Sequence, residues 1–237
     1  MTESVAVIHR VLTRGSSFPS VVETTTGRRY VMKLAGAGPG SRALATEFMA
    51  LELARHLGLK VPETAILHLP RDLPWLVGTD EFYEAAQRSA GLNLGIAFIP
   101  DARDLKGMEL ATLPEEFLGR LAAVDALLQN VDRTKANPNI LHDASGVHWA
   151  IDFGACLLID RLARGAVTPR IGLPPNHFLA GPERPQPAVR ELAATIDRAH
   201  LEAIAAALPK AWLQELAFSR ETLRLRLRSY LEAVRAT

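Results

Sequence analysis

The sequence has very little cysteine, almost no net charge and no long apolar run. Cys156 is the single cysteine among 237 residues, so no intramolecular disulfide or thiolate metal site can form, which is typical of the reducing cytoplasm. Lys and Arg number 27 against 26 Asp and Glu, so no global basic field favours nucleic acid or an acidic membrane. No segment approaches the roughly 20 apolar residues that a transmembrane helix needs. Glu3 and the short apolar run at residues 5–8 do not resemble a signal peptide. We therefore expect a cytoplasmic protein.

The composition is that of a folded chain, because 48% of the residues are hydrophobic and only 22% are charged. In the first part, runs rich in Val, Thr and Tyr predict strands, and a 3.6-residue apolar repeat after Ser41 predicts a helix that ends at Gly58. The remaining expected elements are a strand at 61–69, a helix opened by Thr79 and a buried strand at 92–99. The first three strands are expected at 5–12, 20–25 and 28–34, as an antiparallel meander opened by the small-residue loop 14–20.

The second part of the sequence is mostly helical in pattern. Thr112 and Pro114 open an expected helix that ends at Asn130, and a hairpin follows with strands at 139–141 and 147–151. Residues 160–187 are rich in Pro and Gly and read as irregular, and three or four helices are expected after them. The pattern predicts a two-part α+β architecture that divides near residue 100.

Two charged residues in the first part stand in elements that could bring them together. Lys33 ends an apolar strand and extends a long cationic side chain from the sheet, which alone is typical of a lysine that reaches solvent. Glu47 lies on the following helix, where it could pair with Lys33. By itself Glu47 would be an ordinary surface glutamate.

Two further motifs lie around the expected hairpin. Asp132 is followed five residues later by Asn137, the spacing of a kinase catalytic loop in which the Asp accepts a hydroxyl proton and the Asn binds a metal ion. An Asx-rich loop that caps a helix end is the structural alternative for this segment. Asp152, Phe153 and Gly154 end the second hairpin strand, where the carboxylate could hold Mg²⁺, the ring could enter the core and the glycine could allow a turn.

The four features occur in the order Lys, Glu, Asp…Asn and Asp-Phe-Gly, each on the element that phosphoryl transfer needs. We therefore predict an α+β, bilobal, protein-kinase-like fold. The chain resembles the HipA-type kinases, in particular the small stand-alone HipA-like kinase domains of bacteria, from about Gly15 to about Cys156. The residues that carry the resemblance are Tyr30-Val31-Met32-Lys33, Thr46-Glu47, the segment from Leu53 to Pro62, the segment from Asn130 to Asn139, and Ile151-Asp152-Phe153-Gly154.

The resemblance implies an N-lobe at residues 1–100, made of an antiparallel sheet, one helix and a nucleotide-covering loop. It implies a helical C-lobe at residues 101–237 that holds the catalytic loop and a metal-binding hairpin. ATP and Mg²⁺ are the implied cofactors, and the implied activity is transfer of the γ-phosphoryl group to a hydroxyl, foremost that of a protein serine or threonine. The partners would be ATP, this hydroxyl acceptor and an antitoxin-like regulator.

The resemblance also assigns roles to single residues. Asp132 would be the catalytic base, Asn137 and Asp152 the metal ligands, and Lys33 the contact to the phosphates, held by Glu47. Ser16 and Ser17 would offer backbone N–H groups to the phosphates. The chain departs from related kinases in having Thr134 and Asn130 where histidines are common, and Asn139 is a second candidate ligand.

The sequence also allows three alternative interpretations, one of a glycine motif and two of the function. Gly36, Gly38 and Gly40 suggest a dinucleotide-binding loop, but the third glycine comes one residue early and the strands before it look like hairpins, so a mobile linker is the better interpretation. A non-catalytic, ATP-binding pseudokinase that acts as an interaction module is the alternative from another class. A small-molecule or lipid kinase on the same scaffold is the alternative within the enzymes, because specificity lies outside these motifs.

Overall fold

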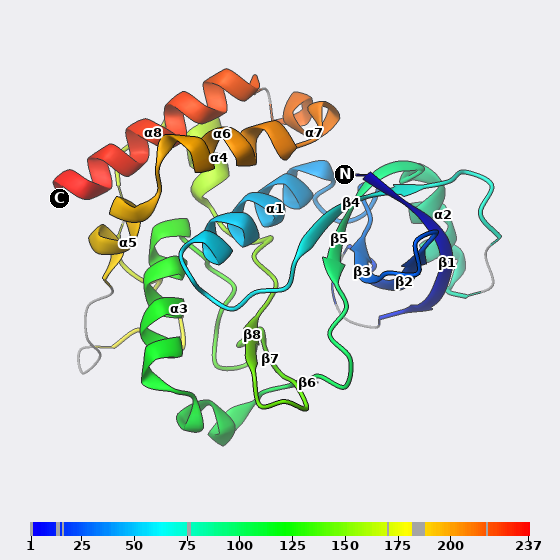
Figure 1. The fold of residues 1–237 in the computed structure, drawn as a ribbon, viewed down its shortest axis with the longest axis horizontal. Helices are drawn as coiled ribbons and strands as arrows, with labels where there is room; N and C mark the ends of the chain where they lie inside the picture. The colour runs from blue at the N-terminus through cyan, green and yellow to red at the C-terminus, as the bar shows by residue number, and fades with distance from the viewer. Residues whose placement is uncertain are drawn as a thin grey trace.

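The computed structural model of the chain describes residues 2–12, 15, 17–74, 77–169, 171–181, 188–216 and 218–237. A five-stranded barrel and a group of helices stand side by side, with a small three-stranded sheet below them (Figure 1). In chain order the elements are β1 (Thr2–Val11), β2 (Ser20–Thr24), β3 (Arg29–Lys33), α1 (Ser41–His56), β4 (Thr64–Leu69), α2 (Asp80–Arg88), β5 (Gly91–Ala97), β6 (Arg103–Asp104), the 3-10 helix η1 (Gly107–Thr112), α3 (Glu115–Leu128), β7 (Ile140–His142), β8 (His148–Ala150), α4 (Leu158–Ala163), α5 (Val189–Thr195), α6 (Arg198–Ala207), α7 (Lys210–Glu215) and α8 (Arg220–Ala236).

The barrel has the strand order β1-β2-β3-β5-β4 and closes on itself. Its first three strands form the predicted antiparallel meander. Strand β5 pairs antiparallel with β3, and β4 pairs antiparallel with β5. We predicted an antiparallel sheet, but one pair of strands differs. Strand β4 pairs parallel with β1, from Thr2 opposite Ile66 to Ser4 opposite His68. Turn residues in a sequence predict pairing only between strands that follow each other in a hairpin. The pairing of β1 with β4 therefore could not be predicted from them. Closure removes the exposed edges of the sheet.

The interior of the barrel is apolar and is covered by α2. Tyr30 and Met32 alternate inward along β3 and meet Leu67 of β4 and Phe82 of α2 in one buried cluster. The predicted start of α2 is confirmed, since Thr79 caps the helix by accepting a hydrogen bond from the Phe82 amide. The described part of residues 1–100 therefore contains two helices, α1 and α2, instead of the single helix implied by the resemblance.

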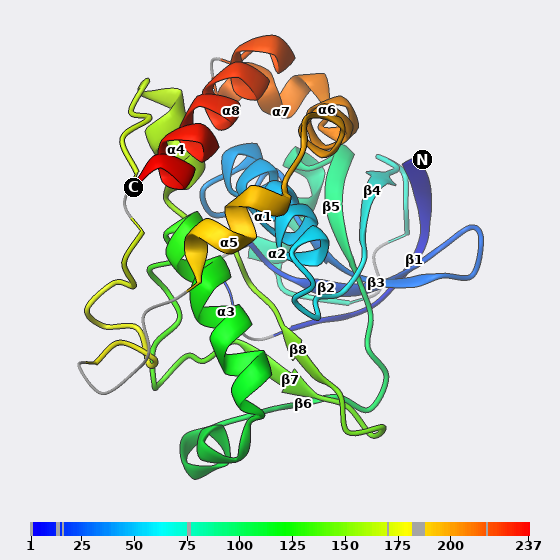
Figure 2. The same cartoon turned by 60° about the vertical axis from the view of Figure 1, so that its left-hand side comes forward.

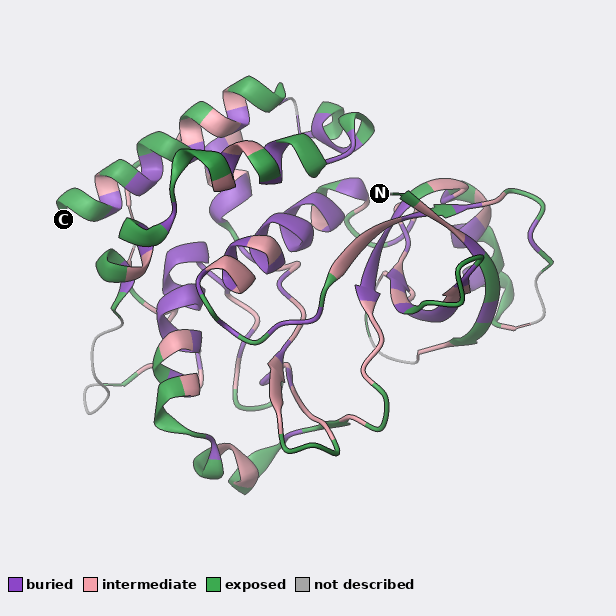
Figure 3. Ribbon diagram, in the orientation of Figure 1, coloured by how far each residue is buried: buried purple, intermediate pink, exposed green. Residues whose placement is uncertain are grey.

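The larger core lies among the helices and includes α1. Leu44, Leu51 and Leu53 of α1 share one buried cluster with residues of α3, α6, α7 and α8, such as Leu121 of α3 and Trp212 of α7. Both cartoon views place α1 between the barrel and the C-terminal helices (Figures 1 and 2), and Figure 3 shows buried residues along this helix. The boundary between the two hydrophobic cores therefore does not lie at residue 100. Helix α1 precedes that position, but it packs with the helices that follow it.

The glycine-containing segment before α1 is fixed in place. The amide of Ala35 donates to Asn93 Oδ1 at 2.8 Å, and the amide of Gly36 donates to Ser89 Oγ at 2.8 Å. Gly40 has φ 74°, a left-handed conformation that suits glycine, and it directly precedes Ser41, the first helical residue of α1. This segment is therefore an ordered connection to α1, in contrast to the mobile linker that we expected.

The second part of the chain contains the predicted hairpin and the predicted helices. Strands β7 and β8 pair across the turn at residues 143–146, where Asp143 Oδ1 accepts hydrogen bonds from the amides of Ser145 at 2.9 Å and Val147 at 3.0 Å. The short β6, which the sequence did not predict, adds to β7. The expected irregular stretch 160–187 contains the end of α4 and an otherwise non-helical described part up to residue 181. None of the described helices has the length and apolarity to cross a membrane.

Candidate phosphoryl-transfer site

Lys33, at the end of β3, contacts two carboxylates that come from distant parts of the chain. Its Nζ lies 2.6 Å from Oε1 of Glu47 on α1 and 2.8 Å from Oδ1 of Asp152, which follows β8. The side chain of Glu47 is 1% exposed and that of Lys33 is 13% exposed, whereas that of Asp152 is 42% exposed. These three residues, named here the site triad, join the barrel, α1 and the hairpin at one point that solvent reaches from the Asp152 side.

The charges of the site triad shift the titration of all three groups. Burial disfavours the Lys33 ammonium, but the carboxylates of Glu47 and Asp152 outweigh it and raise the pKa of Lys33. Burial, only partly offset by the Lys33 ammonium, raises the pKa of Glu47. Burial also opposes ionisation of Asp152, yet the charge and hydrogen bond of Lys33 prevail and hold the pKa of Asp152 below its ordinary value. At neutral pH the lysine is therefore firmly cationic and Asp152 is firmly anionic.

The residues after β8 hold Asp152 in an unusual backbone conformation. Asp152 itself has φ 58°, in the left-handed region that costs a non-glycine residue energy and that clusters at functional sites. Gly154, which was expected to allow a turn, lies in a turn that the Cys156 amide closes on the carbonyl oxygen of Phe153 at 3.1 Å, without a positive φ of its own. Phe153 is fully buried in the larger core, as predicted, and its backbone amide donates a hydrogen bond to the Glu47 carboxylate. The anchored ring and this amide hold the Asp152 carboxylate next to Lys33.

Asp132 and Asn137 lie on the loop between α3 and β7 and contact each other. Asn137 Nδ2 donates to Asp132 Oδ2 at 2.9 Å. A tight turn sets this contact, because the amides of Thr134 and Asn137 donate to each other's carbonyl oxygens at 3.1 and 3.2 Å. Burial and the nearby negative charge of Asp152 raise the pKa of Asp132, and the adjoining amides of Asn139 and Asn137 only partly oppose this. The two aspartates thus share one local electrostatic field.

Asn139, the second candidate ligand, directly precedes β7. Its φ is 52°, and its carbonyl oxygen accepts hydrogen bonds from Arg133 Nη1 at 2.9 Å and from the Ile151 amide at 3.0 Å. Its side-chain amide adjoins the Asp132 carboxyl and lowers the pKa of that group. Its backbone therefore ties the loop to the strand that leads to Asp152.

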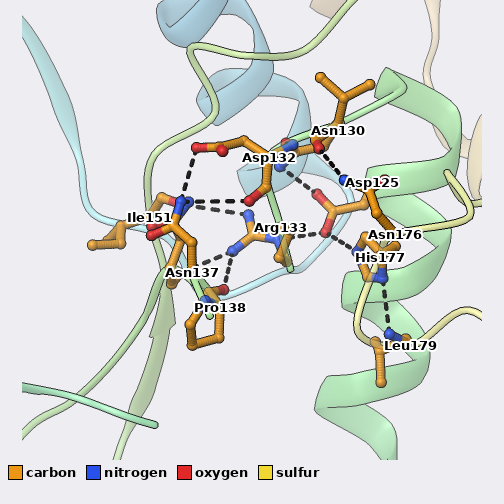
Figure 4. Close-up of polar contacts among 12 residues, drawn as sticks. Asp125, Asn130, Asp132, Arg133, Asn137, Pro138, Ile151, Asn176, His177 and Leu179 are labelled. Atoms are coloured by element: carbon orange, nitrogen blue, oxygen red, sulfur yellow. Dashed lines mark hydrogen bonds and ion pairs between the residues drawn. The ribbon is translucent and has the colours of Figure 1, made fainter. Parts of the chain in front are cut away.

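A fully buried ion pair, which no pattern in the sequence predicted, lies next to Asp132. The guanidinium of Arg133 donates from Nε to Asp125 Oδ2, and both side chains are 0% exposed (Figure 4). Arg133 also donates to the carbonyl oxygens of Pro138 at 2.8 Å and Ile151 at 3.3 Å, and its Cζ lies 4.8 Å from the Phe153 ring centroid. One arginine thereby connects α3, the Asp132 loop and the segment that carries Asp152.

Two more buried side chains complete this network. Asn130 donates from Nδ2 to Asp125 Oδ1 at 3.0 Å, and its Oδ1 accepts the amide of Asp132 at 3.2 Å. His177 Nε2 lies 3.0 Å from Asp125 Oδ2. We name Asp125, Arg133 and His177 the frame. Asp125 carried a signal in the sequence, since it is a charged residue within an apolar helix segment, whereas His177 in a Pro-rich stretch carried none.

The loop between β1 and β2 approaches the site triad from the barrel side. The carbonyl oxygen of Ser17 accepts the amide of Leu34 at 3.1 Å, which places Ser17 beside the strand end that carries Lys33. Phe18 has φ 46°, and its ring meets that of Phe82 edge-on with centroids 6.1 Å apart. Ser16, the other expected phosphate contact, lies outside the described residues.

The donor set suits a hard divalent cation that keeps part of its own shell. Asp152 and Asn137 offer carboxylate and amide oxygens, which are the ligands that Mg²⁺ prefers. Among the described residues no group of three or more His, Cys, Asp and Glu side chains forms a metal cage. Mg²⁺ is commonly held by one or two protein carboxylates together with phosphates and waters. The partly exposed Asp152 fits this ion, and Asn137 lies on the neighbouring loop in contact with Asp132, whose pKa the charge of Asp152 raises.

Comparisons with known proteins show the family and the fold of this chain. A family model described as HipA-like kinase matches residues 5–236. No curated protein matches. The solved structure of the proinflammatory kinase CtkA of Helicobacter pylori is similar with a TM-score of 0.58 at 12% identity, over 100% of this chain and 97% of that one. The golgi casein kinase is similar at 11% identity and a TM-score of 0.48, over 98% of this chain and 71% of that one. The CtkA likeness shows an α+β kinase-like fold, and the family match over nearly the whole length shows that this chain belongs to the HipA-like kinase family.

Proposed function

We propose that this kinase binds ATP with Mg²⁺ in the space around the site triad and transfers the γ-phosphoryl group to a hydroxyl. The observation that carries the proposal is the contact of Lys33 with both Glu47 and Asp152, at 2.6 and 2.8 Å, from three separate elements. Phosphoryl transfer needs mainly positioning and charge stabilisation, and this arrangement supplies a fixed cation beside a partly exposed carboxylate. In this proposal the barrel with α1 and α2 forms the N-lobe and the remaining elements form the C-lobe.

Each residue of the site has a stated part in the proposal. Lys33 binds the phosphates and Glu47 keeps its ammonium in place, while Ser17 offers its amide from the loop above. Asp152 and Asn137 hold the metal ion. When bound, Mg²⁺ supplies positive charge that offsets the negative charge of the phosphate oxygens.

Asp132 is the proposed proton acceptor for the attacking hydroxyl. The raised pKa of Asp132, caused by burial and by the charge of Asp152, makes its carboxylate a better base than an exposed aspartate. Asp132 is partly exposed, so the hydroxyl group of a substrate can reach its carboxylate from solvent. The acceptor class, a protein serine or threonine, is proposed from the resemblance to HipA-type kinases.

The first test is calorimetric titration of ATP into the full chain, with and without Mg²⁺. We expect Mg²⁺-dependent binding that is lost in Asp152→Asn. The matched control is Asp197→Asn, because Asp197 caps α6 through the His200 amide at 2.9 Å and asparagine is an equally good cap. Absence of binding to the wild type would overturn the proposal.

The second test separates a kinase from a pseudokinase. The wild type is incubated with Mg-ATP and a degenerate serine and threonine peptide library, and peptide phosphate is measured by mass spectrometry. Transfer to peptide supports the proposal, and its loss in Asp132→Asn supports the role of Asp132. Binding of Mg-ATP without transfer to peptide, to the chain itself or to small hydroxyl compounds would identify an ATP-binding interaction module instead.

A further inference from the structure

A non-helical segment at residues 174–180, named here the strap, contacts the backbone on both sides of Asp132. Asn176 Nδ2 donates to the carbonyl oxygen of Val131 at 3.1 Å (Figure 4). The amide of Phe178 donates to the carbonyl oxygen of Arg133 at 3.2 Å. The two residues that flank Asp132 are therefore held from the same segment, and Asp132 cannot change its backbone orientation without breaking these bonds.

His177, between these two contacts, is buried and has a defined tautomer. The amide of Leu179 donates to His177 Nδ1 at 3.0 Å, so Nδ1 presents a lone pair and carries no proton. The ring proton of the neutral imidazole is then on Nε2, which donates to Asp125 Oδ2 at 3.0 Å. Both side chains of this pair are 0% exposed. The hydrogen bond between strap and α3 is thus directional and shielded from water.

We propose that His177 is a positioning residue for phosphoryl transfer, which sets Asp132 relative to Asp152 through Asp125 and Arg133. His177 and Arg133 share the same carboxylate oxygen, Oδ2 of Asp125, so the histidine limits the rotation of this carboxylate against the guanidinium. The inference rests on the proposed function, because it concerns the geometry of that reaction.

The path from His177 to the reacting groups is a chain of hydrogen bonds. Arg133 is adjacent to Asp132 in the sequence and donates at 3.3 Å to the carbonyl oxygen of Ile151, the residue before Asp152. A tilt of the Arg133 guanidinium would therefore change the separation of Asp132 and Asp152. Misplacement of a reacting group by about 1 Å can cost about 100-fold in rate, even when the altered residue is far from the chemistry.

Two substitutions separate the two hydrogen bonds of His177. In His177→Gln the amide nitrogen reaches about as far as Nε2, so the donor to Asp125 is kept and the acceptor for Leu179 is lost. In His177→Asn the amide oxygen can replace Nδ1 toward Leu179, but no donor reaches Asp125. We expect His177→Asn to lower kcat about 100-fold with unchanged Kd for Mg-ATP, and His177→Gln to restore most of kcat.

A control variant calibrates the effect of lost stability alone. Val234→Ala removes two methyl groups from a fully buried site on α8, in the same core as α3 but on a different element from the strap. Each variant is compared at equal folded fraction, determined by urea unfolding. A purely structural role for His177 predicts that His177→Asn, once folded, has the kcat of Val234→Ala, and this result would overturn the proposal. Equal kcat losses in His177→Asn and His177→Gln would also overturn it.

A second measurement does not depend on activity. The ¹⁵N chemical shifts of the imidazole distinguish the protonated ring nitrogen from the unprotonated one, and we expect His177 to carry its proton on Nε2. A proton on Nδ1 would overturn the proposal whatever the kinetics. If the wild type transfers no phosphoryl group, the proposed function fails and this proposal with it. If the wild type transfers normally and His177→Asn does too, only the proposal for His177 fails.

Discussion

The site triad and the frame are both clusters of opposite charges, but they differ in access to water. In the site triad, Asp152 is 42% exposed and one lysine serves two carboxylates. In the frame, Arg133, Asp125 and His177 are each 0% exposed. A ligand or a metal ion can therefore compete for Asp152, whereas nothing from solvent can compete for Asp125. Exchangeable and fixed ion pairs therefore lie next to each other in this site.

The two clusters also use different cations for physical reasons. Lysine presents a compact ammonium that can move from one carboxylate to another ligand, which suits the site triad. Arginine presents a planar fork of donors, and Arg133 uses it on Asp125, Pro138 and Ile151 together with the Phe153 ring. Arg133 is thus suited to fixing several segments at once.

The largest expected effect comes from Asp132→Asn, which leaves the ion pairs of both clusters in place. Loss of a general base lowers turnover about 100- to 10,000-fold. Because burial and the Asp152 charge raise the pKa of Asp132, its charged form is disfavoured in the folded protein, so the free energy of unfolding should not fall. Steady-state transfer and urea unfolding check the two statements, with the exposed Asp80→Asn as control. Retained turnover would remove Asp132 from the mechanism.

The second largest effect is expected on stability, where Arg133→Met and Lys33→Met compare the contributions of the two clusters to the free energy of unfolding. Arg133→Met leaves Asp125 as a buried carboxylate without its guanidinium, and loss of one partner of a buried ion pair costs about 3–5 kcal/mol. Lys33→Met leaves Glu47 buried, but the pKa of Glu47 is already raised by burial, so it can take up a proton. We therefore expect a smaller loss in Lys33→Met, measured as the free energy of unfolding in urea.

The control for these two substitutions is Arg198→Met, which breaks an exposed pair with Glu202. Exposed pairs contribute at most about 1 kcal/mol, so this variant measures the effect of the side-chain change alone. The double variant Lys33→Met with Glu47→Gln should recover part of the loss, because no buried charge is left in it. An equal loss in Arg133→Met and Lys33→Met would contradict the distinction between the two clusters.

The smallest expected effect is a dependence of stability on pH in the metal-free protein. Lys33 lowers the pKa of Asp152 against the opposing effect of burial, so the folded state favours the charged form. The stabilisation by Asp152 is then complete above the ordinary value of 3.8 and is lost as the pH falls through the lowered pKa. The difference in free energy of unfolding between wild type and Asp152→Asn should accordingly shrink on acidification. A difference that grows toward low pH would show the opposite sign of the shift.

The sequence allowed prediction of the elements and motifs that depend on neighbours along the chain. The turn at residues 143–146, the cap at Thr79 and the spacing from Asp132 to Asn137 each need only a few adjacent residues. The meeting of Lys33 with Glu47, 14 positions apart, followed from the strand-to-helix order. The parallel pairing of β4 with β1 could not be predicted in this way, because no turn joins the two strands.

The contacts of the frame lie beyond the range of such reasoning. Asp125 and His177 are 52 positions apart, and the strap has neither a helical nor a strand pattern that could place it. A buried polar side chain must find a partner, but the identity of this partner is decided by which segments the fold brings together. Asn139 illustrates the same limit, since its carbonyl oxygen accepts the amide of Ile151, which directly follows β8 and which no local pattern places there.

Side-chain type and local spacing were sufficient to predict the strand and helix periodicity and the order of the chemical groups, which is Lys33, Glu47, Asp132 and Asp152. The tertiary structure alone decided that Lys33 holds two carboxylates, that Asp152 takes the left-handed conformation and that His177 stands behind Asp132. These arrangements arise from the packing of distant segments, where burial makes each charge and each hydrogen-bonding group seek a partner.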